Sequence, residues 1–239
     1  MKPRRPAPKT TADGYFTAAS LRFLRELAAN NERSWFHAHR ARYEADVRLP
    51  FQRLLGDLQP ALAAISPHYR SDPKTIGGSM FRIQRDTRFA HDKSPYKSWQ
   101  GARLFHERRR QVAAPSFYIH LQPGSSFVGA GFWHPETRTQ RRIRQFIFEN
   151  PESWARAAHD LALRRRFSLL SDDMLVRLPA GYPADFAHAD DLRRRNFALV
   201  RPLGDSDMTG EGLLRTLEGD LAELAPLVDY LCAALDLEF

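Results

Sequence analysis

The sequence predicts an α+β fold with N-terminal helices, a central, mainly antiparallel sheet that contains a β-hairpin, and C-terminal helices packed on that sheet. Three observations support this prediction. Apolar residues recur at helical spacing before residue 65, strand-like alternation and a hairpin signal follow, and helical spacing returns at the C-terminus. The chain has 239 residues, of which 43% are hydrophobic, so it can bury a substantial core. We assign residues 14–239 to a single domain and expect residues 1–13 to be a disordered basic tail.

The first part of the domain is predicted to be helical. Thr17 is the expected N-cap of the first helix, and Asn31 is the expected N-cap of the second. Pro50 begins a third helical pattern, because proline is tolerated in the first turn of a helix.

Residues 80–89 change to the alternation of a half-buried strand. In this strand Phe81 and Ile83 would face the core, and Arg82 would face outwards. The residues that follow this strand are rich in cations and are expected to form a structured loop.

The clearest hairpin in the chain has arms at Ser116–Gln122 and Phe127–Trp133, which flank the turn Pro123–Ser126. Gly129 and Gly131 lie inside the second arm. Glycines within a strand indicate a bulge or a close approach by backbone or ligand.

Helical spacing returns over Thr139–Glu149, and Pro151 opens a further helix. Short segments around Leu175–Leu178 and Phe197–Val200 are predicted to be edge strands. These elements extend the α+β pattern towards the C-terminus.

The C-terminal stretch repeats leucine and valine every three or four residues, which is the spacing of an apolar helical seam. Pro226 interrupts this seam and is expected to start a new helix or to kink the existing one. Packing on the domain core is the preferred interpretation of the seam, and a dimer interface is the alternative. The oligomeric state is not predicted.

The charge of the chain is unevenly distributed. Residues 1–204 contain 35 Lys and Arg against 19 Asp and Glu, whereas residues 205–239 contain one Arg against nine acids. A basic body suggests an acidic partner such as nucleic acid or a phosphorylated ligand. However, 31 of the 36 cations are Arg, a bias that genome composition also produces.

The expected compartment is the cytoplasm. Cys232 is the only cysteine, so the chain has no intramolecular disulfide, which fits a reducing environment. The basic N-terminus has no apolar region typical of a secretory signal. No run approaches the length of about 18 apolar residues that would span a bilayer, so no membrane partner is predicted.

Residues 81–98, FRIQRDTRFAHDKSPYKS, are the densest cluster of chemically capable side chains. Guanidinium and ammonium groups bind phosphate and carboxylate groups, so this segment predicts an anion-binding site, and the alternative is an ion-pair network that only holds the loop. The predicted ligand-binding residues are Arg82, Arg85, Asp86, Arg88, Lys93, Tyr96 and Lys97.

Neither a metal site nor a cofactor is predicted. The pair His91–Asp92 lacks the further ligands that a metal centre needs, and His37 and His39 do not share one face of a helix. His120 lies in the hairpin and is expected to be a satisfied sheet histidine. No nucleophile–base pair is visible, so the catalytic residues, if any, are unknown.

Several motifs together resemble the domain-of-unknown-function family 2461, a set of conserved hypothetical proteins of bacteria and fungi. They are Asn31, Trp35, Phe36 and Tyr43, the run at residues 81–98, the hairpin sequence GAGFWHP, and RLPAGYPADFAHADDLRRRNFALVRPL. The resemblance extends over about residues 15–235. The chain departs from the family pattern at Ala90–His91 and at Arg195. The resemblance implies a single intact domain and adds no reaction.

Three functions therefore remain open. The first is the binding of a small phosphate- or carboxylate-bearing ligand at residues 82–97, with or without catalysis. The second is a nucleic-acid-associated protein, in which a basic face follows the phosphates and Trp99 and Trp133 stack on bases. The third is a structural or interaction module.

Overall fold

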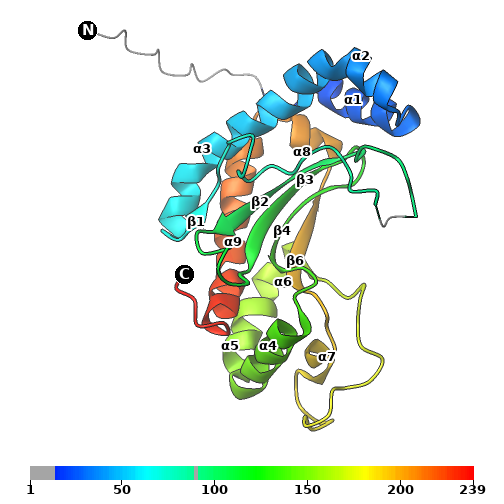
Figure 1. Cartoon of the computed structure of the whole chain (residues 1–239). Helices are drawn as coiled ribbons and strands as arrows, with labels where there is room; N and C mark the ends of the chain where they lie inside the picture. Colours follow the sequence, from blue (N-terminus) through cyan, green and yellow to red (C-terminus); the bar gives the residue numbers. More distant parts are fainter. Residues whose placement is uncertain (1–13, 89–90) are drawn as a thin grey trace.

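The computed structural model describes residues 14–88 and 91–239 and has a six-stranded antiparallel sheet at its centre (Figure 1). The strands are β1 (Tyr69–Arg70), β2 (Gln100–His106), β3 (Ser116–Leu121), β4 (Ser126–Phe132), β5 (Ser168–Leu169) and β6 (Phe197–Leu203). Their order across the sheet is β1-β2-β3-β4-β6-β5. Together with the helices at both ends of the chain, this sheet confirms the predicted α+β fold. The predicted tail at residues 1–13 lies outside the described residues.

The helices precede and follow the strands of the hairpin. They are α1 (Ala18–Ala29), α2 (Arg33–Tyr43), the π-helical turn η1 (Glu44–Arg48), α3 (Leu49–Ile65), α4 (Thr137–Glu149), α5 (Pro151–Ala158), α6 (Leu161–Arg166), α7 (Ala189–Leu192), α8 (Asp205–Thr209) and α9 (Leu213–Ala233). Thr17 caps α1 as predicted, because its side chain accepts a hydrogen bond from the backbone of Ala19. Pro50 lies in the first turn of α3, but η1 joins this helix to α2 without a break.

The prediction that Asn31 caps α2 was wrong. The N-cap is Glu32, which makes no capping hydrogen bond with its side chain. The Asn31 amide instead binds both backbone groups of Tyr96, with Nδ2 donating to the carbonyl oxygen at 2.9 Å and Oδ1 accepting from the nitrogen at 3.0 Å. This residue therefore connects the α1–α2 turn to a loop 65 residues away.

The predicted strand at residues 80–89 was also wrong. Its described part, residues 80–88, forms only two isolated bridges, Met80 with Ala102 and Gln84 with Tyr96. Ile83 is buried as predicted, at 3% exposure, but the Phe81 side chain is 36% exposed. The segment runs alongside β2, a strand that the sequence pattern did not predict. β2 pairs with β3 from Gln100 to Phe105.

The hairpin of β3 and β4 confirms the strongest strand prediction. Its register continues without a bulge into the pairing of β4 with β6. The two glycines of β4 instead allow a close approach of the β6 backbone, since a Cβ on Gly129 would lie 2.6 Å from the carbonyl oxygen of Leu199. The predicted edge strand at Phe197–Val200 falls within β6, which is an inner strand, and Leu175–Leu178 forms no strand.

Helix α9 crosses one face of the sheet and contacts β3, β4 and β6 as well as α3 and α5 (Figure 1). The seam residues Leu217, Leu221, Leu224 and Val228 have no exposed surface. The seam is therefore buried inside the domain, as the core-packing interpretation predicts. The helix is continuous through Pro226, so no new helix starts there. Among the described residues, none of the helices has the length and hydropathy needed to cross a bilayer.

One glycine of α9 allows a direct test of this helix. Gly219 is exposed, and a Cβ at this position would meet no atom within 4 Å. Gly219→Ala is therefore expected to raise the free energy of unfolding by about 0.5–1 kcal/mol, because glycine loses more backbone entropy in a helix than alanine. Urea denaturation measures this change. An unchanged or lower stability would show that α9 is not regular at this point.

Candidate functional site

The described residues of the cationic loop, 82–88 and 91–97, form two internal ion pairs. Arg85 pairs with Asp92 and donates to Ser94 Oγ at 2.9 Å, and Arg88 pairs with Asp86 at 2.7 Å. Hydrogen bonds from Ser94 and Arg85 lower the pKa of Asp92 to about 2, and the hydrogen bonds from Arg88 lower the pKa of Asp86. Both carboxylates are therefore ionised at neutral pH and offset these arginines.

The lysines and the tyrosine of the loop also have internal contacts. Lys93 Nζ donates to a backbone carbonyl at 3.0 Å, and Lys97 Nζ donates to two, at 2.5 and 3.0 Å. Burial and the nearby Arg85 lower the pKa of Lys97. Tyr96 is only 5% exposed and its ring stacks on Phe36, with centroids 4.2 Å apart. Much of the hydrogen-bonding capacity of this loop is thus used to hold its own conformation.

The predicted site residues divide between two clefts that meet at Tyr96. The first has a volume of about 500 Å³. The predicted residues that line it are Arg85, Asp86, Tyr96 and Lys97. Arg82 lines the second cleft, of about 540 Å³, and Arg88 and Lys93 line neither. Because Asp86 and Asp92 also line the first cleft, its cations are balanced by acids.

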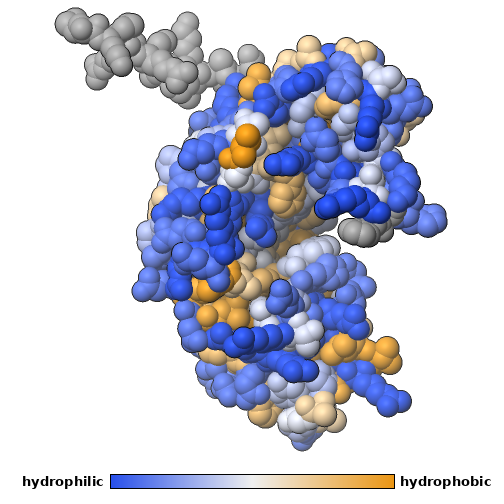
Figure 2. All heavy atoms as spheres, viewed as in Figure 1, coloured by the Kyte–Doolittle hydropathy of each residue, from blue (hydrophilic) through white to orange (hydrophobic). Residues whose placement is uncertain are grey.

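A larger apolar groove, of about 610 Å³, lies on the face of the sheet opposite to α9. The face of the molecule in Figure 2 is hollowed below the N-terminal helices, and hydrophobic residues are exposed in the hollow. Strand alternation places the side chains of Tyr118 and His120 on this face, opposite Gly129 and Phe127 of β4. The residues with ring side chains that line the groove are Phe81, Trp99, Tyr118, His120, Phe127, Phe132 and Trp133.

His120 is at the centre of these rings. Its imidazole stacks on Phe127 with centroids 4.7 Å apart, and Trp99 lies at the same centroid distance. His120 Nε2 is 2.9 Å from Gln122 Oε1, and an amide oxygen only accepts, so Nε2 carries the proton. Nδ1 then accepts from the Tyr118 hydroxyl at 3.0 Å. Burial lowers the pKa of His120, so the imidazole is neutral at pH 7.

The Arg103 side chain projects from the same face of the sheet. Arg103 lies opposite Tyr118 in the β2–β3 register, is exposed, and forms no ion pair with any carboxylate in residues 14–88 and 91–239. Trp99 lines both the groove and the first cleft, and Lys97 Nζ lies 5.4 Å from the centre of its ring. The arrangement can hold a flat or apolar group against the rings and an anionic group against Arg103.

The sequence predicts several residues of this groove but not the groove itself. Trp99 and Trp133 are the predicted exposed aromatics; Trp133 is 54% exposed, and Trp99 is partly buried. His120 is predicted to be a satisfied sheet histidine, and both of its ring nitrogens have partners. The sequence pattern that could have revealed the groove is the alternation of Tyr118 and His120 along one hairpin arm, with Phe127 opposite His120 on the other arm.

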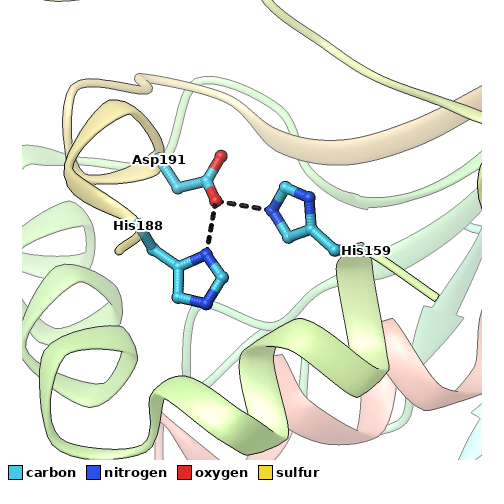
Figure 3. Close-up of side chains that lie close together, drawn as sticks. All are labelled: His159, His188 and Asp191. Atoms are coloured by element: carbon cyan, nitrogen blue, oxygen red, sulfur yellow. Dashed lines mark hydrogen bonds and ion pairs between the residues drawn. The ribbon is translucent and has the colours of Figure 1, made fainter. Parts of the chain in front are cut away.

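A separate polar cluster joins α5 to α7 (Figure 3). Asp191 is only 3% exposed, and its Oδ2 accepts from His159 Nε2 at 2.6 Å and from Trp154 Nε1 at 2.8 Å. Its Oδ1 accepts from Arg194 Nε at 2.7 Å, and His188 Nδ1 lies 3.5 Å from Oδ2. Although two histidines and one carboxylate are a common metal-binding set, N–H donors already satisfy both oxygens here. We therefore interpret the cluster as a structural network.

Comparison with known proteins identifies one family. The family model described as "Conserved hypothetical protein (DUF2461)" matches residues 19–230, which include the cationic loop, the groove and most of α9. Neither the search of the curated proteins nor the search of the solved structures gives a match. As the motifs at residues 81–98 and in the hairpin predicted, the chain belongs to the conserved hypothetical protein family DUF2461.

Proposed function

We propose that this protein binds a small organic anion with a flat or apolar part, in the groove on the open face of the sheet. The observation that carries the proposal is a ring-lined groove of about 610 Å³ that contains an arginine, Arg103, without an acidic partner among the described residues. Small-molecule sites are typically concave and mostly apolar, with a few polar groups that fix the orientation of the ligand.

The rings supply the apolar part of the proposed site. Phe81 and Trp133 are 36% and 54% exposed, so a ligand would bury apolar surface that is in contact with water in the free protein. Tyr118 and His120 are held by their mutual hydrogen bond, so these rings are already ordered before a ligand binds. A planar ligand can stack on such rings without rearranging the sheet.

Arg103 supplies the anionic contact, because the planar guanidinium group matches the geometry of a carboxylate or phosphate. Lys97, which lines the first cleft near the Trp99 ring, is a second contact for a longer ligand. This proposal keeps the anion-binding hypothesis for the loop at residues 82–97, but it assigns the main contact to β2. The reason is that Arg85 is already paired with Asp92 in the loop.

A second candidate function is the binding of single-stranded nucleic acid. It is favoured by Trp99 and Trp133, which line the same groove and could each stack on a base. This mode requires several phosphate contacts, and its affinity would fall steeply as salt is added.

The proposal is tested by titrating the protein with AMP and with phenyl phosphate. Isothermal titration calorimetry and quenching of tryptophan fluorescence measure the binding. Arg103→Gln is expected to weaken the binding of at least one of these probes about 10- to 100-fold, since a charge-assisted hydrogen bond contributes about 1.5–3 kcal/mol. Arg108→Gln is the matched control. Arg108 is an exposed arginine just after β2 that does not line the groove, so this variant should bind like the wild type.

The same experiment includes a labelled oligodeoxythymidylate at two salt concentrations. Binding of the oligonucleotide that is lost at higher salt, without binding of either small probe, would favour the nucleic-acid function. If Arg103→Gln and Arg108→Gln bind all probes as the wild type does, the groove is not the anion site.

A further inference from the structure

A further cleft, which we call the arginine cleft, has a volume of about 850 Å³ and lies between α4 and the segment that leads into β6. It shares no lining residue with the groove on the sheet. Among the described residues, no aspartate or glutamate lines it. The arginines that line it are Arg141, Arg142, Arg144 and Arg195.

Arg144 forms a wall of this cleft and is only 5% exposed. Its guanidinium donates to the backbone carbonyls of Leu192 and Arg194, each at 2.7 Å, and to Gln140 Oε1 at 2.9 Å. All three acceptors are neutral. A buried charge is usually balanced by an opposite charge, and no carboxylate among the described residues pairs with Arg144.

The surrounding charges do not supply this balance. Arg142 pairs with Asp236 at 2.7 Å, and Arg195 Nε is 3.6 Å from Asp173 Oδ1. Arg141 is exposed and makes no ion pair with a carboxylate of the described residues. Burial lowers the pKa of Arg144; Tyr182 opposes this shift, and repulsion from Arg195 and Arg141 adds to it. Two guanidinium groups of the cleft, those of Arg141 and Arg144, therefore have no carboxylate partner among the described residues, and an anion would relieve their repulsion.

We propose that this cleft binds a multiply charged oxyanion of the phosphate class. Arg141 and Arg195 contact the anion through their guanidinium groups, which suit the tetrahedral oxygens of a phosphate. Arg144 is a positioning residue, because it holds the end of α7 and adds positive charge to the wall of the cleft. The arginine run in α4 and the start of β6 are far apart in the sequence, so only the fold creates this site.

Inorganic pyrophosphate is the probe for this cleft. With the full chain at constant ionic strength, pyrophosphate is expected to raise the melting temperature and to bind in calorimetry more tightly than monovalent phosphate. Arg141→Gln and Arg195→Gln are each expected to weaken pyrophosphate binding at least about tenfold, since each removes charge-assisted hydrogen bonds. Arg144 is not replaced, because its loss would also remove the contacts to Leu192 and Arg194.

Two control variants make the test specific. Arg138→Gln removes an exposed arginine on α4 that does not line the cleft, and Arg103→Gln removes the cation of the groove. Both are expected to bind pyrophosphate like the wild type. If Arg138→Gln weakens pyrophosphate binding as much as the cleft variants do, the effect is general charge attraction and the proposal is overturned. The proposal is also overturned if pyrophosphate stabilises the protein no more than sodium chloride does, or if Arg141→Gln binds pyrophosphate like the wild type. A loss caused by Arg103→Gln would instead place the pyrophosphate in the groove.

Discussion

Replacement of Asp191 by alanine is expected to lower the free energy of unfolding by about 3–5 kcal/mol, since it removes one partner of a buried ion pair. Arg194, His159 and Trp154 all donate to this carboxylate, and its residue is 3% exposed. The variant would leave Arg194 without its acidic partner. Urea denaturation of the wild type and the variant measures the difference.

The neighbouring Asp190 provides the control. Its side chain is 84% exposed and, among the described residues, pairs only with Arg193 in the same turn, so Asp190→Ala should change stability by no more than about 0.5 kcal/mol. A similar loss in Asp190→Ala and Asp191→Ala would contradict the assigned network. Such a result would mean that the negative charge of α7, and not the buried hydrogen bonds, determines the loss of stability.

The contribution of Asp191 also depends on pH. Although burial opposes ionisation, hydrogen bonds from His159, Trp154 and Arg194 outweigh it and hold the pKa of this carboxyl well below its usual range. The unfolded chain therefore binds a proton on Asp191 at a higher pH than the folded chain does. The stabilisation is fully present above the unfolded pKa of about 3.9 and is lost as the pH falls towards the lower folded pKa. The stability difference between the wild type and Asp191→Asn should thus shrink below about pH 4.

Gly131→Ala is expected to be the most damaging change of a single glycine in the sheet. Gly131 has a φ of 132°, and a Cβ at this position would lie 2.1 Å from the carbonyl oxygen of Phe197. The backbone strain alone costs about 1–3 kcal/mol, and relief of the overlap would separate β4 from β6. A loss of at least about 3 kcal/mol, or failure to fold, should follow.

Gly124→Ala is the matched control for backbone strain. Gly124 also has a positive φ, of 71°, but a Cβ there would meet no atom within 4 Å. This variant should lose only about 1–2 kcal/mol, the cost of a left-handed conformation for a residue with a Cβ. Denaturation curves that rank Gly124→Ala as equal to or worse than Gly131→Ala would disprove the close approach of β4 and β6. If Gly131→Ala gives no soluble folded protein while Gly124→Ala folds normally, the prediction is met with the largest possible effect.

The two proposed anion sites share one physical feature, namely that each contains an arginine without an acidic partner among the described residues. The loop at residues 82–97 has the highest density of charge, yet Arg85 and Arg88 pair with Asp92 and Asp86. Arg103 and Arg141 come from less conspicuous segments and have no such partner among the described residues. A charged motif therefore indicates where charges are concentrated, but pairing decides which of them can attract a ligand.

The sequence by itself determined the features that depend on neighbouring residues. Thr17 caps α1, the turn between the hairpin arms sets the β3–β4 pairing, and the leucine spacing marks α9. Each of these depends on contacts within a few residues or on one consistent periodicity. The motifs at residues 81–98 also indicated the family before the fold was known.

The tertiary structure alone decided the rest. Alternation at residues 80–89 resembles a strand, but a strand needs a partner along its length, and the described residues of this segment form only the isolated bridges Met80–Ala102 and Gln84–Tyr96. Asn31 has a residue type that suits a helix cap, yet the backbone of Tyr96 takes its amide group. The groove and the arginine cleft join residues from distant segments, so their geometry follows from the packing of the sheet and helices and cannot be read from local sequence patterns.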